Sequence, residues 1–431
     1  MKKIISIILI VAICLCLTAC NGGYDTSSDN TVYEYEEIIM NSDGTQQTTQ
    51  GLGGDLTNGT GSSQNSSTDP SSSGSENMID FNTTVEVDIC DPIIRAYLDA
   101  TDPREQYTFL SQYGHMELDY QVLPLKWRNN GSQQYTAYIS ENADFSNSYI
   151  CKFSGSQFNF GICVPGKTYY WKVIGSYSDE ILGGGKMHIT NKPVRWLNID
   201  GVSNVRDMGG WKTTSGKTVK YGKLYRGSYL DNITDTGLIT LKALGIKSDF
   251  DIRSTESWDS NGPVPKTGLS YYFFDTNVHY DYVLSGGANE SEIRENYPKL
   301  FEQLANESNY PIYLHCNYGN DRTGSMAFIL NGLLGVTYED LTRDFELTSY
   351  AYSHDNRWRG NGTGGTFGPN DLIQENISGS HVDARWGMMN KAFMESKYCT
   401  DGTLATAIEN FLIDRGVNKA HINAYKQIML G

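Results

Sequence analysis

The chain has 431 residues, of which 34 are Lys or Arg and 50 are Asp or Glu, so its formal net charge at neutral pH is −16. This length allows more than one domain, and a surface this acidic repels nucleic acid and anionic lipid head groups, so we expect no nucleic-acid partner. The seven His are scattered, no Cys or His cluster has metal-ligand spacing, and no dinucleotide or Walker fingerprint occurs, so we expect no metal and no cofactor.

The first 20 residues have the pattern of an export signal. Lys2 and Lys3 precede an apolar run from Ile4 to Leu17, and small residues then lead to Cys20. The run is shorter than the ~20 apolar residues of a typical membrane-spanning helix, so it predicts export rather than a membrane span.

The end of this signal, LTAC at residues 17–20, resembles the bacterial lipobox. The resemblance implies that residues 1–19 are a lipoprotein signal peptide and that Cys20 becomes the lipid-modified first residue. The two acyl chains of such an anchor are enough to hold a protein stably on a membrane. It therefore predicts a lipoprotein on the extracytoplasmic face of the bacterial cell membrane. An ordinary secretory cleavage that leaves Cys20 free is the alternative.

Residues 20–78 consist almost wholly of Ser, Thr, Asn, Gly, Gln, Asp and Glu. They show no hydrophobic periodicity and offer little to bury, so they predict a disordered acidic tether. A flexible chain of this length has a mean reach of roughly 40 Å.

Residues 79–192 contain short aromatic stretches that alternate with polar residues. The stretch 134–140, QYTAYIS, has the period of a half-buried strand, and 164–173, VPGKTYYWKV, is typical of a turn followed by an aromatic strand. These stretches resemble the fibronectin type III repeat, which implies a small antiparallel β-sandwich. Such a module serves as a spacer or binds a protein or a glycan. An amphipathic segment around Pro92–Leu98 is expected to pack ahead of it.

Export also permits disulfides. Cys151 and Cys163, both in this region, are the candidate pair, and two free thiols are the alternative.

The most informative segment is HCNYGNDRTG at residues 315–324, which we call the signature loop. The apolar stretch 311–314 before it predicts a buried strand, and 325–334 after it has the length and spacing of a helix. A loop between a strand end and a helix start offers backbone N–H groups and the helix dipole to an anion. We therefore predict a phosphate-binding loop. Its phosphate-binding residues are Asn317, Tyr318, Gly319, Asn320 and Gly324.

The side chains of the loop suit the cleavage of a phosphate ester. Cys316 is the candidate nucleophile, because a helix N-terminus and a neighbouring Arg lower the pKa of a thiol. Arg322 offers a planar fork for two phosphoryl oxygens. The Thr323 hydroxyl is placed to stabilise the sulfur as a leaving group. These residues predict two in-line displacements without a metal.

The segment contains the Cys-x5-Arg signature of the protein tyrosine phosphatase superfamily. Its longer form resembles a bacterial tyrosine phosphatase family that includes a secreted phosphatase of mycobacteria. Three further blocks, NVRDMGG at 204–210, LYRGS at 224–228 and GIKSDFDIR at 245–253, resemble that family's Asn-Phe-Arg-Asp-Leu-Gly-Gly, Tyr-Arg-Ser/Gly and Gly-Ile-x-x-Val-x-Asp-Leu-Arg patterns. The resemblance implies an α/β phosphatase domain over residues 193–431, with a mainly parallel central sheet flanked by helices.

The same resemblance suggests the general acid. In the family an Asp inside the signature loop is thought to serve, which here is Asp321. The rival is Asp275, which follows an apolar strand-like run before the signature loop. Arg206 and Asp207 are expected to support the loop or steer substrate, a structural salt bridge being the alternative. His315 is expected to orient the nucleophile rather than to act as a base.

One departure from the family bears on the substrate. The family usually has Lys before the Asp-Arg pair, associated with phosphoinositide recognition, and here that residue is Asn320. The loss of this cation weakens the case for multiply charged head groups. The substrate implied is therefore phosphotyrosine in a protein or peptide, with phosphoserine, phosphothreonine or a small phosphomonoester beside it. An inositol phosphate or phosphoinositide phosphatase, and a catalytically inactive surface adhesion protein, are the alternatives.

Overall fold

The structure is a computed structural model, and it describes residues 33–40, 46–53, 79–113, 125–154, 160–176, 179–255, 267–276, 288–351 and 385–431. Within these ranges no helix has the length and hydrophobicity to cross a membrane. The predicted signal peptide, Cys20 and most of the predicted tether lie outside the described residues.

A five-stranded sheet lies at the centre of the C-terminal half. Its strands lie in the order β11-β10-β12-β9-β8; β9, β10, β11 and β12 run parallel, and β8 is antiparallel to β9. The mainly parallel sheet predicted for residues 193–431 is thus confirmed. The strands are β8 (Arg206–Asp207), β9 (Leu224–Gly227), β10 (Ser248–Asp251), β11 (Ser270–Phe273) and β12 (Ile312–His315).

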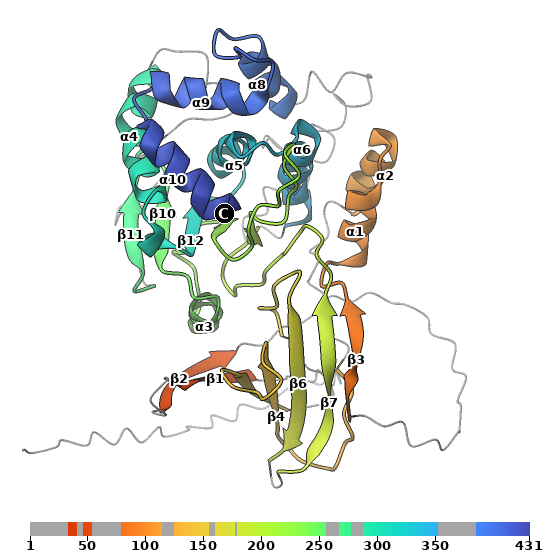
Figure 1. Cartoon of the computed structure of the whole chain (residues 1–431). Helices are drawn as coiled ribbons and strands as arrows, with labels where there is room; N and C mark the ends of the chain where they lie inside the picture. The colour runs from red at the N-terminus through yellow and green to blue at the C-terminus, as the bar shows by residue number, and fades with distance from the viewer. Residues whose placement is uncertain are drawn as a thin grey trace, which may run out of the picture.

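Helices cover one face of this sheet (Figure 1). Because side chains alternate along a strand, Ile312 and Leu314 of β12 point to this face and join one core with the helices, whereas Tyr313 joins a second core on the opposite face. The helices of the C-terminal half are α3 (Asp235–Ala243), α4 (Ala288–Leu304), α5 (Asp321–Leu333), α6 (Tyr338–Glu346), α8 (Arg385–Met394), α9 (Leu404–Asp414) and α10 (Lys419–Leu430), with short 3₁₀ turns at Glu307–Asn309 and Leu347–Tyr350.

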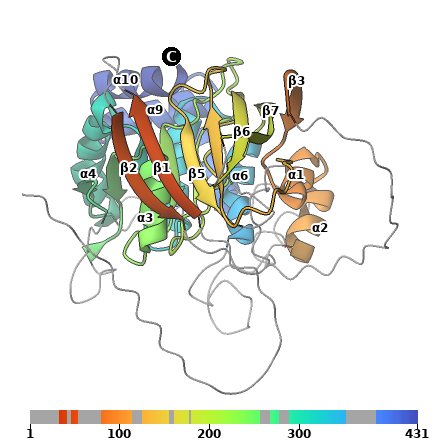
Figure 2. The same cartoon turned by 90° about the horizontal axis from the view of Figure 1, so that it is seen from below.

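The N-terminal half contributes one seven-stranded sheet in the order β2-β1-β5-β4-β6-β7-β3 (Figure 2). The strands predicted within 134–140 and 164–173 are confirmed as β4 and β6. The two packed sheets of a sandwich are not seen in the described residues, so the sandwich prediction is corrected to a single sheet. The strands are β1 (Tyr33–Met40), β2 (Gln46–Gly53), β3 (Ile79–Val87), β4 (Tyr135–Ser140), β5 (Tyr149–Phe153), β6 (Thr168–Gly175) and β7 (Ile181–Ile189).

The physical reason for a single sheet is that its apolar face already has a partner. Buried residues of this sheet, such as Trp171 and Val173, share one core with Tyr225 and Tyr313 of the central sheet and with Leu241 of α3. The central sheet therefore takes the place that a second sheet would occupy in a sandwich, and the two predicted domains have a common core.

Two further expectations for the N-terminal half differ from the structure. Strands β1 and β2 fall within the predicted tether, and Glu34–Glu37 of β1 pair with Tyr149–Lys152 of β5. The Tyr and Ile residues of β1 favour a strand, a signal that the polar composition of 20–78 conceals. Cys151 and Cys163 are both buried free thiols, so the candidate disulfide is not formed.

Helix α1 (Pro92–Asp99), followed by α2 (Pro103–Tyr113), confirms the amphipathic segment but packs elsewhere than expected. Its buried Tyr97 donates a hydrogen bond to Glu346 of α6 and meets Tyr350 edge-on at 5.8 Å between ring centroids. Asp91 caps the helix by accepting from the N–H of Ile93 at 2.7 Å. Helix α1 thus belongs to the helical core of the C-terminal half.

We predict that a fragment of residues 193–431 is far less stable than one of residues 21–431. Without the N-terminal sheet and α1, the apolar side chains of Tyr225, Leu241 and Tyr313 would face water, at a cost of about 1.5–3 kcal/mol for each large side chain. Thermal unfolding of the two fragments measures the difference. Equal melting temperatures would show that the shared core contributes nothing to the stability of the C-terminal half.

Candidate active site

The signature loop joins β12, which ends at His315, to α5, which begins at Asp321. The predicted strand, loop and helix are confirmed. The helix begins four residues before the apolar stretch at 325–334, because its first turn consists of polar residues that the hydrophobic pattern does not reveal. Asn320 occupies the N-cap position but makes no side-chain capping bond. The Asn320 side chain therefore does not cap the N-terminus of α5, and a helix N-terminus is the kind of site that binds anions.

Cys316 lies at the base of this loop, 3% exposed. Burial alone would raise the pKa of its thiol, but the charge of Arg322 and the hydroxyl and N–H of Thr323 outweigh burial and hold the pKa below its ordinary value. The Thr323 hydroxyl oxygen is buried and finds no oxygen or nitrogen partner in the described residues. The role predicted for Thr323, stabilising the sulfur as a leaving group, stays a prediction.

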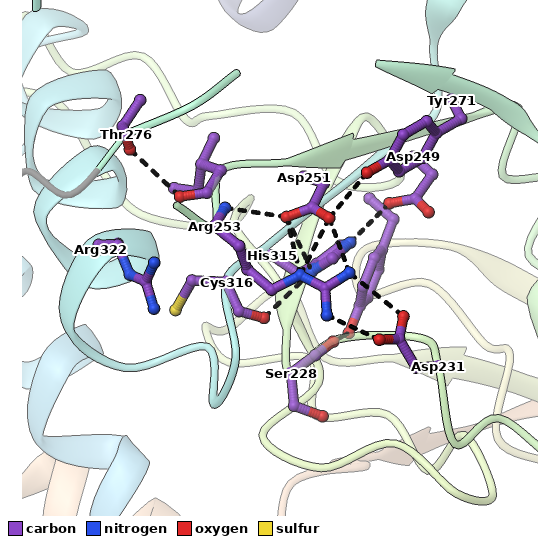
Figure 3. Close-up of polar contacts among 12 residues, drawn as sticks. Ser228, Asp231, Asp249, Asp251, Arg253, Tyr271, Thr276, His315, Cys316 and Arg322 are labelled. Atoms are coloured by element: carbon purple, nitrogen blue, oxygen red, sulfur yellow. Dashed lines mark hydrogen bonds and ion pairs between the residues drawn. The ribbon is translucent and has the colours of Figure 1, made fainter. Parts of the chain in front are cut away.

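Arg322 lies on the first turn of α5, and Figure 3 shows its guanidinium beside the sulfur of Cys316. Its Nη1 lies 3.4 Å from the Ser254 hydroxyl, at the end of the segment that follows β10. The side chain is 9% exposed, so its charge acts where water is scarce. A thiolate and a guanidinium at the mouth of a helix can hold a phosphoryl group and attack it.

His315 lies beneath the loop, in a buried polar cluster. Its Nε2 is 2.9 Å from Oδ1 of Asp249, and its Nδ1 is 3.1 Å from the carbonyl oxygen of Cys316 (Figure 3). Asp251 accepts hydrogen bonds from Arg253 Nη2 at 2.8 Å and Tyr271 Oη at 2.9 Å. The orienting role predicted for His315 fits this position.

Two buried arginines form a polar network beside the loop, which Arg226 contacts directly. Arg226 Nη2 donates to the carbonyl oxygen of Gly319 at 2.8 Å and Arg226 Nη1 to Asp344 Oδ2 at 2.5 Å. Arg206 Nε donates to the other oxygen of Asp344 at 3.0 Å. Asn204 Nδ2 donates to the carbonyl oxygen of Tyr318 at 3.1 Å. We call Arg206, Arg226 and Asp344 the arginine clamp.

The structure places both members of the predicted pair at 206–207 in the interior. Arg206 belongs to the clamp, and it is connected to the signature loop indirectly, through other residues of this network. The Asp207 carboxylate accepts from the N–H of Gly209 at 2.9 Å and of Gly222 at 2.7 Å, and pairs with buried Arg195 at 3.1 Å. Their contacts are those of supporting residues and of a structural salt bridge.

The two candidate acids have different surroundings. Asp321 is the first residue of α5, half-buried, and its Oδ1 accepts a hydrogen bond from Asn320 Nδ2 at 3.0 Å. The Asp275 carboxylate lies 3.3 Å from both the N–H and the hydroxyl of Thr255. Asn320 is itself buried, so its side chain serves Asp321 and does not extend into solvent.

Sequence reasoning missed the clamp residues Arg226 and Asp344, the supporting Arg195 and the His315 partner Asp249. Arg226 and Asp249 lie within blocks that the family patterns had already marked. Asp344 carried a weaker signal, an acidic residue on the apolar side of an amphipathic helix, between Leu341 and Phe345. Within the described residues no group of three or more His, Cys, Asp and Glu is placed to hold a metal ion.

Comparisons with known proteins agree on the C-terminal half. Residues 197–430 match the model of the tyrosine phosphatase family. A protein of Cupriavidus necator named "putative tyrosine-protein phosphatase" is 24% identical over 168 residues, which are 35% of this chain and 61% of that protein. This chain therefore spans less than two thirds of that relative's length.

Two solved structures also match with low overlap. The core catalytic domain of the PP-IP phosphatase Siw14 from Saccharomyces cerevisiae, in complex with citrate, is 17% identical with a TM-score of 0.23, covering 35% of this chain and 79% of that one. A second structure of the Siw14 catalytic core is 18% identical with a TM-score of 0.21, covering 39% of this chain and 88% of that one.

Proposed function

Because this chain belongs to the tyrosine phosphatase family, we propose that its C-terminal half hydrolyses phosphotyrosine through a phosphocysteine intermediate. The observation that carries the proposal is the environment of Cys316, whose pKa is held down by Arg322 and Thr323 even though burial opposes it. A structural cysteine in an apolar core would show the opposite shift, as Cys163 does, where burial raises the pKa.

The reaction proceeds in two displacements. The Cys316 thiolate attacks phosphorus in line with the ester oxygen, the S–P bond forms and the P–O bond breaks, and the tyrosine oxygen takes a proton from the general acid. Water then attacks phosphorus and loses its proton to the same group. The S–P bond breaks, inorganic phosphate leaves, and the Thr323 hydroxyl stabilises the returning thiolate.

Asp321 is the general acid that we propose. It stands next to Arg322 on the first turn of α5, and Asn320 holds one of its oxygens. The Asp275 carboxylate instead accepts from Thr255, which holds it against the segment after β10. Asn320 thereby has a role that a Lys could not fill in the same way, since an ammonium would pair with the carboxylate and depress its pKa.

The substrate preference follows from charge. The signature loop itself contains two side chains that can be positive, His315 and Arg322, and His315 is buried against Asp249. One exposed phosphomonoester fits this arrangement, whereas an inositol polyphosphate would need cations from outside the loop. A substrate panel separates the two classes.

The LTAC pattern supports an anchored location, and we propose that Cys20 holds the enzyme on the extracytoplasmic face of the membrane. The seven-stranded sheet would then stand between the anchor and the active site. A protein or glycan partner for its outer face belongs to the same proposal.

The test is hydrolysis of phosphotyrosine peptide, phosphoserine peptide, phosphoinositide and inositol hexakisphosphate by residues 21–431 without added metal. We expect turnover on phosphotyrosine that Cys316→Ser abolishes, while the control Cys399→Ser retains it. Asp321→Asn should lower kcat by about 10²–10⁴, and Asp275→Asn should change it little.

The remaining outcomes each decide one point. An unchanged rate in Asp321→Asn with a lost rate in Asp275→Asn would move the acid to Asp275. Faster turnover of inositol hexakisphosphate than of phosphotyrosine would assign the other substrate class. Inorganic phosphate binding without any turnover would make the protein a binding module.

A further inference from the structure

A buried carboxylate, Asp249 on β10, faces the histidine beside the nucleophile. In the parallel pairing of β10 with β12, Asp249 lies opposite Tyr313 and Asp251 opposite His315, so these four side chains share one face of the sheet. The Oδ1 of Asp249 is 2.9 Å from His315 Nε2, and the two side chains are 4% and 1% exposed. The family pattern quoted above has an apolar Val where this chain has Asp249.

Both nitrogens of the His315 ring face acceptors. Nε2 faces the Asp249 carboxylate, and Nδ1 lies 3.1 Å from the carbonyl oxygen of Cys316 and 4.0 Å from Asp251 Oδ1. A neutral imidazole has one N–H and would turn a lone pair toward one of these oxygens. The doubly protonated ring is the form that presents an N–H to each of these oxygens.

We propose that Asp249 is a positioning residue for the reaction proposed above, holding His315 as an imidazolium that orients the Cys316 carbonyl and so the first peptide of the signature loop. A peptide unit is planar, and its C=O and N–H point in opposite directions. When the Cys316 carbonyl is held toward His315, the N–H of Asn317 points the other way, and the loop enters its turn in one orientation.

Asp251 cannot take over this function, because its carboxylate is already engaged. It accepts from the Arg253 side chain, from the Arg253 N–H at 2.8 Å and from Tyr271, and Arg253 in turn pairs with Asp231. The other polar side chain facing the ring, Tyr313, donates to the Ser228 carbonyl. Within the described residues Asp249 is thus the carboxylate in direct contact with the ring.

The carboxylates around His315 predict an upper pH limit for the order of the signature loop. Burial alone would lower the pKa of His315, but Asp249 and Asp251 outweigh it and raise the pKa to about 9. A group whose pKa is raised on folding stabilises the fold fully below its ordinary value near 6.5, and this contribution disappears as pH rises through about 9. Loop order, and with it phosphate binding, should be lost over the same range.

The experiment follows His315 directly. Histidine-labelled protein of residues 21–431 is titrated by NMR, with His315→Gln to assign the signal, in wild type, Asp249→Asn and Asp249→Val. We expect wild-type His315 to be charged at pH 7.5 and the Asp249 variants to shift its transition down by about one to three pH units. Asp231→Asn, which removes a carboxylate that contacts Arg253 and not His315, should leave the transition in place.

Two functional measurements complete the test across pH 6–9.5, kcat/KM on phosphotyrosine peptide and the Kd for inorganic phosphate. Relative to wild type, Asp249→Asn should have a kcat/KM and a phosphate affinity lower by about tenfold or more at pH 8.5, and both should change little at pH 6. A neutral His315 in wild type at pH 7.5, or a shifted His315 with unchanged pH profiles, overturns the proposal. If wild type has no turnover the proposed function fails, and the phosphate Kd profile still decides the role of Asp249. The wild-type titration decides it even where a variant does not fold.

Discussion

Asp344→Asn is expected to destabilise the protein by about 3–5 kcal/mol, because it leaves two buried guanidiniums without their carboxylate. Arg206 and Arg226 are both fully buried, and Asp344 accepts from each through a different oxygen. In Asn one of these two oxygens becomes an NH2 group, which donates and cannot accept from a guanidinium, and the negative charge is lost. Burial and the charge of Arg206 already lower the pKa of Arg226 to about 10, and in the variant the two cations would lack their shared counterion.

Loss of the clamp should also reach the active site. Arg226 holds the carbonyl oxygen of Gly319, so a displaced guanidinium loosens the signature loop and lowers kcat/KM. Thermal unfolding of Asp344→Asn is compared with that of Asp340→Asn, which removes a half-exposed carboxylate from the same helix. Its pair with Arg343 should be worth less than about 1 kcal/mol. Equal melting temperatures for the two variants would show that the clamp carries no stability.

The pH dependence provides a second check on the clamp. Burial alone would raise the pKa of Asp344, but Arg206 and Arg226 outweigh it and lower the pKa below 3.8. A carboxyl group whose pKa falls on folding stabilises the fold above its ordinary value, and this contribution is lost as pH falls below about 4. Wild type should therefore lose more stability between pH 5 and pH 3 than Asp344→Asn does.

The part of the fold that local pattern determines could be predicted. A strand followed by a polar loop and a helix at 311–334, and alternating strands within 134–140 and 164–173, follow from side-chain period and loop chemistry. The apolar pattern predicts the start of α5 too late, because Asp321, Arg322 and Thr323 interrupt the apolar period. The candidate nucleophile Cys316 and the candidate phosphate ligand Arg322 belong to one short segment, so the sequence could predict that they lie close together.

What could not be predicted depends on contacts between distant segments. The single seven-stranded sheet and its shared core with Tyr225 and Tyr313 arise because two apolar faces meet, and each face alone is equally compatible with a sandwich. The clamp joins Arg206 to a residue 138 positions away. Charge alone does not tell which of 50 acidic residues is buried beside which Arg, since a pair on the surface and a pair in the core have the same letters.

Gly319→Ala is expected to abolish most phosphatase activity, because the loop approaches β9 too closely for any side chain. Gly319 has φ +68°, and a Cβ built there would lie 2.4 Å from the carbonyl carbon and oxygen of Gly227. Those atoms are backbone, so they cannot rotate away, and the loop must move from the strand by a substantial fraction of an ångström. A misplacement near 1 Å costs about 10² in rate where attacking and leaving atoms must be in line.

Gly245→Ala is the matched control, since Gly245 has the same φ of +68° and no atom lies within 4 Å of the position that a Cβ would take there. Both variants bear the left-handed strain of about 1 kcal/mol, and the steric conflict with β9 belongs to Gly319→Ala alone. We therefore expect Gly245→Ala to lose a little thermal stability and to retain kcat/KM on phosphotyrosine peptide, while Gly319→Ala loses about 10² in kcat/KM or more. Similar kinetics in the two variants would mean that Gly319 is needed for its left-handed backbone conformation and not for the close approach of the loop to Gly227.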